Sequence, residues 1–263
     1  MAEQDLKNEN VVENEELPVN PLREVNVIQA GEVRDENGVC YDLQRGIDVS
    51  EHQGEIDWTL MAENKPDFVL IRCGFRGYGE AGRLCADAYY EENLRGALAL
   101  GVPVGLYFFS QAVNEAEAVE EAEFLLELLS GYSPADFSLP VFFDWEEISV
   151  EAARTDGVPG SAMTECALAF CRRMEEAGFA PGIYAYRSLA YYRYDLPAIS
   201  AYPLWIGAQG YCPDFYYGFQ LWQYSTAGEC PGISGSVDLD MIFVPKASVT
   251  EPTEVPDTQV KVG

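Results

Sequence analysis

The sequence predicts an α/β protein, an irregular single-domain TIM-like β/α barrel with about eight strands. Two observations support this class. Short apolar runs alternate with segments of helical hydrophobic spacing, the pattern of βα units around a mainly parallel sheet. The length of 263 residues also suits one such barrel. The expected strands are, in chain order, residues 45–49, 68–73, 102–109, 139–143, 182–185, 204–206, 219–223 and 237–241.

Three segments between these strands carry apolar residues at spacings of three and four. They are residues 86–100, 114–129 and 161–177, which we expect to form helices on the outside of the barrel. Later connections, such as residues 209–218, are too short and too aromatic for a full helix. The barrel should therefore be irregular in its last third.

The two ends of the chain differ in composition from the middle. Residues 1–37 hold ten acidic residues against three basic ones, with little apolar periodicity, and are predicted to be a disordered acidic linker. Residues 247–263 are rich in Thr, Pro and Glu and are predicted to be a flexible tail. The catalytic barrel is expected at residues 38–246.

Charge and composition exclude several classes of function. A net charge of -28 argues against nucleic-acid binding, which depends on Lys and Arg neutralising phosphates. The absence of an apolar run of about 18 residues argues against membrane insertion. Seven cysteines without a CxxC pair and a single histidine offer no zinc site, so we expect neither metal nor cofactor. Cys212 with Cys230 is the one pair that we consider for a disulfide.

Four acidic side chains are expected at the mouth of the barrel, where strand ends place catalytic residues. Asp48 ends the first strand, Asp144 and Glu146 follow the fourth, and Asp238 lies in the last. Residues two apart on a strand share a face, so Asp144 and Glu146 enter one cavity. Close carboxylates raise one pKa and supply both a proton donor and an anion, as glycoside hydrolysis requires. An Asp-x-Glu alone is usually a solvated pair, so the convergence of four acids carries the prediction.

Polar and aromatic residues flank these acids on the predicted strands. Aromatic rings stack on the apolar faces of sugars, although packing in the core is an equally good explanation for each ring. The candidates for substrate binding are Tyr107, Tyr184, Trp205, Trp222 and Gln223. Trp145 and Glu147 should point away from the mouth by strand alternation, and His52 should lie in a loop at the cleft rim.

An ordered set of motifs resembles the strand-end motifs of glycoside hydrolase family 25, the lysozymes of the Chalaropsis type. The motifs are GIDVSEHQGEIDW (46–58), VPVGLYFFS (102–110), LPVFFDWEE (139–147), PGIYAY (181–186), LWIGAQG (204–210), LWQYS (221–225) and GISGSVDLD (232–240). The resemblance implies a muramidase that cleaves the β-1,4 bond between N-acetylmuramic acid and N-acetylglucosamine. The sequence departs from the family at Phe108, where a histidine often follows the tyrosine of the third strand.

The same resemblance implies roles for the acids. Glu146 would be the general acid, and Asp144 would either orient the N-acetyl group of the substrate or stabilise charge at the anomeric carbon. Asp48 and Asp238 would position substrate and raise the pKa of Glu146. Whether the acetamide or an enzyme carboxylate attacks the sugar is left open by the sequence.

Two alternatives to a muramidase are a chitinase-like N-acetylhexosaminidase and a catalytically weak cell-wall-binding domain. Chitinase-like barrels carry a D-x-x-D-x-D-x-E run, whose first acids are missing before Asp144. The intact set of four acids gives no support to a binding domain without turnover. We expect a monomer that acts on peptidoglycan glycan strands in an extracellular or cell-wall location. The polar run after Met1 is no signal peptide, so we expect an export signal or anchor outside this sequence.

Overall fold

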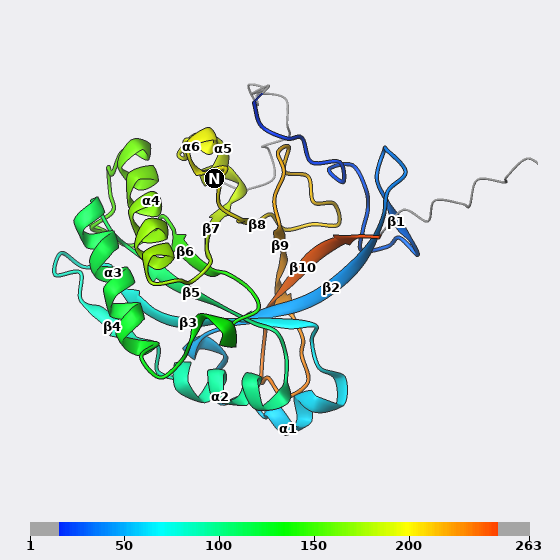
Figure 1. Cartoon of the computed structure of the whole chain (residues 1–263), viewed down its shortest axis with the longest axis horizontal. Coiled ribbons are helices and arrows are strands. Elements are labelled where there is room, and N and C mark those ends of the chain that lie inside the picture. Colours follow the sequence, from blue (N-terminus) through cyan, green and yellow to red (C-terminus); the bar gives the residue numbers. More distant parts are fainter. Residues whose placement is uncertain (1–15, 247–263) are drawn as a thin grey trace, which may run out of the picture.

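The computed structural model describes residues 16–246, and eight strands in this part of the chain close into a barrel (Figure 1). The predicted single-domain α/β barrel is confirmed. Going around the barrel, the strands are β2 (Cys40–Val49), β3 (Phe68–Arg76), β5 (Val104–Ser110), β6 (Val141–Trp145), β7 (Pro181–Tyr186), β8 (Leu204–Gly207), β9 (Leu221–Gly228) and β10 (Val237–Pro245). Two short strands, β1 (Val33–Arg34) and β4 (Leu84–Ala86), pair with β2 and β3.

The last strand closes the barrel in the opposite direction to the others. Neighbouring strands from β2 to β9 pair in parallel, whereas β10 is antiparallel to both β9 and β2. The start of β10 therefore lies at the barrel edge where the parallel strands end. This reversal pairs Asp238 directly with Asp48.

Helices surround much of the barrel. The three expected outer helices are present as α2 (Tyr90–Leu100), α3 (Glu115–Leu128) and α4 (Gly160–Glu176), with shorter helices α1 (Trp58–Met61), α5 (Arg187–Tyr192) and α6 (Leu196–Ile199). Three 3-10 turns are η3 (Glu51–Gln53), η4 (Ala62–Asn64) and η5 (Pro134–Asp136). Helix α2 begins later than predicted because residues 84–86 pair with β3 as strand β4.

The N-terminal boundary differs from the sequence prediction of a disordered linker through residue 37. Residues 16–37 pack on the barrel, with Leu22, Val27 and Val33 buried in its main hydrophobic core. Val19 forms a β-bridge with Tyr217, inside the β8–β9 connection that was expected to lack a full helix. The apolar residues of this segment are too widely spaced for a periodic pattern, so composition alone indicated a linker. Predictions for residues 1–15 and 247–263 lie outside the described residues.

Strand alternation divides the hydrophobic residues into an outer and an inner cluster. The outer cluster lies between strands and helices and includes Phe143 and Trp145. Trp145 is fully buried there and its indole N–H donates to Ala112 O at 2.9 Å, as expected for an outward-facing residue. The inner cluster fills the barrel and consists of Phe68, Leu70, Tyr107, Phe142, Tyr184, Trp205 and Leu221. The inner rings form the floor beneath the barrel mouth.

The cysteines make no disulfide. All seven are free thiols, so the disulfide between Cys212 and Cys230 considered from the sequence is wrong. Buried thiols such as Cys166 and Cys171 pack in the outer core as small apolar side chains. Within residues 16–246, none of the helices has the length and apolar character that crossing a membrane would need.

Candidate active site

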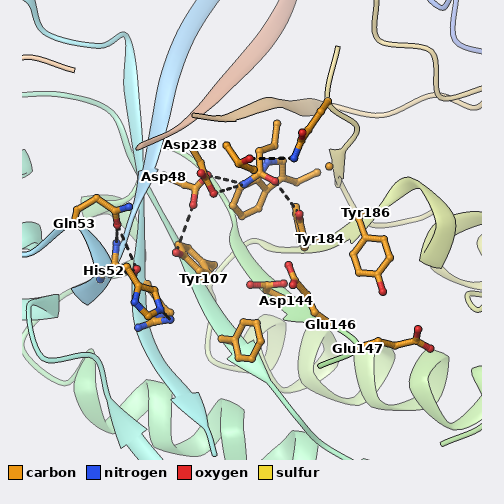
Figure 2. A pocket seen from close by; sticks show the side chains of 18 of the residues that line it. Asp48, His52, Gln53, Tyr107, Asp144, Glu146, Glu147, Tyr184, Tyr186 and Asp238 are labelled. Atoms are coloured by element: carbon orange, nitrogen blue, oxygen red, sulfur yellow. Dashed lines mark hydrogen bonds between the residues drawn. The ribbon is translucent and has the colours of Figure 1, made fainter. Parts of the chain in front are cut away.

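A cleft of about 540 Å³ opens at the mouth of the barrel, and all four predicted acids line it (Figure 2). Asp48 comes from the end of β2, Asp144 from β6, Glu146 from just beyond β6, and Asp238 from the start of β10. Asp48 and Asp238 lie together on one side of the cleft, and Asp144 and Glu146 lie together on another. The structure thus brings together carboxyl groups that are up to 190 residues apart in the sequence (48 to 238).

Gln223 on β9 links the first pair of acids. Its amide nitrogen donates to Asp48 Oδ2 at 2.8 Å and to Asp238 Oδ2 at 3.3 Å. Its amide oxygen accepts a hydrogen bond of 2.8 Å from the Tyr184 hydroxyl, and this donor fixes which way the amide points. Tyr107 adds a weak contact to Asp48 Oδ1, at 3.5 Å. Gln223, Tyr184 and Tyr107 all line the cleft, as the sequence predicted.

The two predicted tryptophans lie in different places. Trp205 lines the cleft floor, with its ring packed edge-on against Tyr107, Phe142 and Tyr184. Trp222 does not line the cleft, contrary to the prediction. It lies in the outer core with its indole N–H bonded to Ala208 O at 2.6 Å. The reason is alternation: Gln223 faces the mouth, so its neighbour in β9 faces outward.

The segment after β6 is fixed by the interior of the protein. Gln111 is fully buried, and its amide nitrogen donates at 2.8 Å to the main-chain oxygen of Glu146. Glu147 lines the rim of the cleft and forms an ion pair with Arg193, so the prediction that it points away from the mouth is wrong. Strand β6 ends at Trp145, and alternation no longer governs the residues beyond it.

Burial and mutual repulsion shift the pKa values of the acids upward. Burial, followed by the charge of Asp238, raises the pKa of Glu146 to about 7. Burial raises the pKa of Asp238 to about 6. Burial, Glu146 and Asp48 together raise the pKa of Asp144 well above its ordinary value. The cleft therefore holds carboxyl groups that keep a proton near neutral pH.

One buried cation faces this acidic cleft. Arg72 on β3 lines the cleft, bonds Asp87 Oδ2 through Nε at 2.8 Å, and lies 3.2 Å from Glu51 Oε1. Its Nη1 is 3.5 Å from Nε2 of His52, which lies in η3 at the rim as expected. Arg72 acts against the upward shift in the pKa of Asp144. The signal for it was a charged residue inside the apolar run FVLIRCGF.

Asp240, a fully buried acid on β10 beneath Asp238, was not predicted from the sequence. Its signal was the alternation in VDLD, which places residues 238 and 240 on one face. Residues 16–246 contain no group of three or more His, Cys, Asp or Glu side chains with the geometry of a metal site.

Comparison with known proteins agrees with this geometry. The sequence profile of glycosyl hydrolases family 25 matches residues 47–233, more than half of the chain. This chain belongs to glycosyl hydrolases family 25. The resemblance inferred from the strand-end motifs is therefore confirmed, and the matched residues include all members of the acid set except Asp238.

Two curated relatives of the family 25 chain are lysozymes. The autolytic lysozyme of Clostridium acetobutylicum is 26% identical over 223 residues, which is 82% of this chain and 62% of that protein. Lysozyme M1 of Streptomyces globisporus is 24% identical over 202 residues, which is 74% of this chain and 66% of that protein. The chain thus spans less than two thirds of the length of the clostridial enzyme.

Solved structures of similar fold include the modular autolysin LytC from Streptococcus pneumoniae, determined in complex with a synthetic peptidoglycan ligand. The TM-score is 0.64 at 26% identity, covering 81% of this chain and 52% of LytC. A family 25 glycosyl hydrolase from Bacillus anthracis has a TM-score of 0.60 at 21% identity, covering 81% of this chain and 93% of that one. The second likeness shows the shared fold.

Proposed function

We propose that this family 25 chain is a muramidase that hydrolyses the β-1,4 bond between N-acetylmuramic acid and N-acetylglucosamine in peptidoglycan. The observation that carries the proposal is the meeting of Asp48, Asp144, Glu146 and Asp238 in one cleft. Tyr107, Tyr184 and Trp205 provide aromatic surface beside these acids, which suits the apolar faces of sugar rings.

Glu146 is the proposed general acid. It lies at the cleft surface just beyond β6, and its raised pKa of about 7 leaves it largely protonated in mildly acidic solution. It therefore gives its proton to the glycosidic oxygen as the bond to the anomeric carbon breaks. Its carboxylate then takes a proton from the water that attacks the anomeric centre in the second step, which returns Glu146 to its starting state.

Asp144 is proposed to orient the N-acetyl group of the substrate. Its Oδ1 is buried and accepts no hydrogen bond from the described residues, so this acceptor is open to a donor on the substrate. The acetamide N–H of the sugar supplies such a donor. The acetamide oxygen then attacks the anomeric carbon, and water opens the resulting ring. An open acceptor for the acetamide N–H favours substrate assistance over attack by an enzyme carboxylate.

The substrate class also implies where the protein acts and with what. We propose peptidoglycan glycan strands as its partner and the cell wall or extracellular space as its place of action, with residues 38–246 as the catalytic barrel. The autolytic lysozyme and the autolysin among its relatives support this assignment. We also propose that the chain acts as a monomer.

The test is digestion of purified peptidoglycan, with mass spectrometry of the fragments after borohydride reduction. We expect the unmodified chain to release fragments with reduced muramic acid at their ends, and Glu146→Gln to lose nearly all of this activity. Glu147→Gln is the matched control, because it removes the neighbouring rim glutamate and should keep substantial activity. Reduced glucosamine ends would instead indicate a glucosaminidase, and wall binding without cleavage would indicate a binding domain.

A second digestion tests the role of Asp144. Glycan strands that lack the N-acetyl group on muramic acid should resist cleavage, because the acetamide of the sugar whose anomeric carbon reacts is the proposed attacking group. Cleavage of fully de-N-acetylated strands at an undiminished rate would refute substrate assistance. It would leave the muramidase assignment itself in place.

A further inference from the structure

Asp240 is an acid with no exposure to solvent, placed one layer below the cleft. It follows Asp238 by two residues on β10 and therefore faces the barrel interior with it. Its side chain is fully buried and does not line the cleft. The indole N–H of Trp205, a residue of the inner cluster, donates to Asp240 Oδ1 at 2.8 Å.

The other oxygen of Asp240 has a different environment. Oδ2 is buried and receives no hydrogen bond from a donor among residues 16–246. Asp240 lies diagonally across the β10–β2 pairing from Asp48, since Asp238 pairs with Asp48 and Asp240 with Gly46. A side-chain hydrogen bond between the two acids raises the pKa of Asp240 and lowers that of Asp48. Two carboxyl groups can share a hydrogen bond only when one of them carries a proton, because an ionised carboxylate has no donor. One acid of this pair is therefore neutral.

The surrounding contacts assign the proton to Asp240. Asp48 lies at the cleft and accepts a hydrogen bond of 2.8 Å from Gln223 and a longer one from Tyr107. Burial and the charge of Asp238 raise the pKa of Asp48 to about 7, and the hydrogen bond from Gln223 acts against this rise. Asp240 has only the Trp205 donor and no solvent. Burial and the nearby Asp48 raise the pKa of Asp240 well above its ordinary value.

We propose that Asp240 is a neutral positioning residue that donates a proton in a hydrogen bond to Asp48, and so favours the ionised form of Asp48 and orients it at the cleft. The consequence for catalysis rests on the proposed muramidase function, in which Asp48 helps to position the substrate. The hydrogen bond itself does not depend on that function. Asp240 supports the site from below and does not touch the substrate.

Other titratable groups face this pair from every side. Acids on β10 and at the end of β6 repel the negative charge of Asp48, and acids and tyrosine hydroxyls surround Asp240. The groups are Asp238, Asp144, Glu146, Tyr107, Tyr184 and Tyr224. Two cations act on this network, Arg72 on Asp144 and Tyr107, and Arg45 on Tyr224. For Asp48, the hydrogen bonds from Gln223 and Asp240 act against the burial and repulsion that raise its pKa to about 7.

Two substitutions test whether Asp240 acts as a neutral hydrogen-bond donor or as a charged group. In Asp240→Asn, the side-chain oxygen can still accept from Trp205 and the amide nitrogen can still donate to Asp48. We expect kcat/KM on peptidoglycan within about threefold of the unmodified chain and an unchanged pH profile. In Asp240→Leu the donor is lost, so the pKa of Asp48 rises. The acidic limb of the profile should then move to higher pH, with a loss of roughly tenfold or more at its former optimum.

The same variants can overturn the proposal. If Asp240→Asn loses as much activity as Asp240→Leu, a charged Asp240 is required and the neutral donor is excluded. Equal pH profiles for the unmodified chain and Asp240→Leu would also exclude it, because a purely structural residue would change the rate without moving the limb. Circular dichroism spectra and thermal unfolding establish that both variants fold.

A measurement independent of catalysis decides the protonation state. In protein labelled with 13C at aspartate carboxyl groups, the Asp240 signal is the one that disappears in Asp240→Asn. We expect it at the position of a protonated carboxyl from roughly pH 5 to 8. A signal at the position of a carboxylate in this range would overturn the proposal, even if Asp240→Leu failed to fold. If the chain cleaved no peptidoglycan but showed the protonated signal, only the muramidase assignment would fall.

Discussion

Asp238 and Asp48 lie opposite each other in the antiparallel pairing of β10 with β2, and one amide, that of Gln223, donates to both carboxyl groups. The two carboxyl groups repel each other when both are ionised, and burial strengthens the repulsion. The amide offers two N–H groups to the two acids, while Tyr184 donates to its oxygen at 2.8 Å and prevents it from flipping. Gln223 thus sets both the geometry and the charge of one side of the cleft.

Replacing Gln223 with Leu should lower kcat/KM on peptidoglycan by roughly tenfold to a hundredfold. The hydrogen bond from Gln223 lowers the pKa of Asp48, so its loss makes Asp48 harder to ionise and leaves the Tyr184 hydroxyl without its acceptor. Gln44→Leu, at an exposed position of β2, is the matched control and should keep full activity. A Gln223→Leu variant as active as this control would show that the bridge is dispensable.

The alkaline limb of the pH profile should report Glu146. Its pKa is about 7 and only the protonated form is an acid, so activity should fall as pH rises through about 7. Asp238 is the largest electrostatic contributor to this shift. Asp238→Asn removes that charge and should move the limb to lower pH, whereas Glu147→Gln should leave it in place. The measurement is kcat/KM against pH for the three proteins, and a limb unmoved in Asp238→Asn contradicts the assignment.

The same shifts make folding stability depend on pH. Buried acids with raised pKa values hold protons in the folded state that the unfolded chain has already released. Between roughly pH 4 and 7 the unfolded state therefore binds fewer protons, and the free energy of unfolding should fall as pH rises. Asp144, a residue that is only 5% exposed, should contribute to this decline, because burial, Glu146 and Asp48 raise its pKa well above its ordinary value.

Thermal unfolding of two variants, followed from pH 5 to 8, checks this contribution. Asp144→Asn cannot ionise at that position, so its unfolding midpoint should decline less with pH than that of the unmodified chain. Asp156→Asn removes one negative charge from an exposed loop and controls for the net charge of -28. Equal slopes for the two variants would assign the decline to general charge repulsion and not to burial of Asp144.

The sequence predicted the elements that alternation and strand ends determine. Apolar runs marked all eight barrel strands, and the acids beside them marked the mouth. Asp238 was predicted at the mouth, although the rule that strand ends mark the mouth does not cover it. Asp238 lies at the start of a strand and not at its end. Only the antiparallel direction of β10 brings it beside Asp48, and pairing direction depends on contacts between distant segments.

The features that escaped prediction also depend on distant contacts. Trp222 was expected in the cleft because it lies on a strand beside the acids, yet Gln223 faces the mouth and alternation sends the side chain of Trp222 to the opposite face. Asp240 and Arg72 have no local pattern that indicates what their buried side chains contact. The N-terminal segment was taken for a linker from its acidic composition, whereas Leu22 and Val27 bury themselves against the barrel.

Gln111 lies behind the segment after β6 and holds the main chain of Glu146. Its amide nitrogen donates to Glu146 O at 2.8 Å, and its amide oxygen accepts from the Thr155 hydroxyl at 3.2 Å. Gln111→Leu should leave the Glu146 carbonyl without this donor, so the carboxyl group of the general acid is no longer held in position. We expect kcat to fall by roughly tenfold to a hundredfold with a smaller change in KM, and stability to fall by about 1 to 3 kcal/mol.

Thr155→Val is the graded control for this effect. It removes only the hydrogen bond that supports the amide of Gln111, so its loss in kcat should be smaller than that of Gln111→Leu. Steady-state kinetics on solubilised glycan measure the effect on catalysis, and thermal unfolding measures the effect on stability. If Gln111→Leu lost stability but kept kcat, Gln111 would support the fold alone, and the position of Glu146 would have to depend on the other contacts of the segment after β6, such as the ion pair between Glu147 and Arg193.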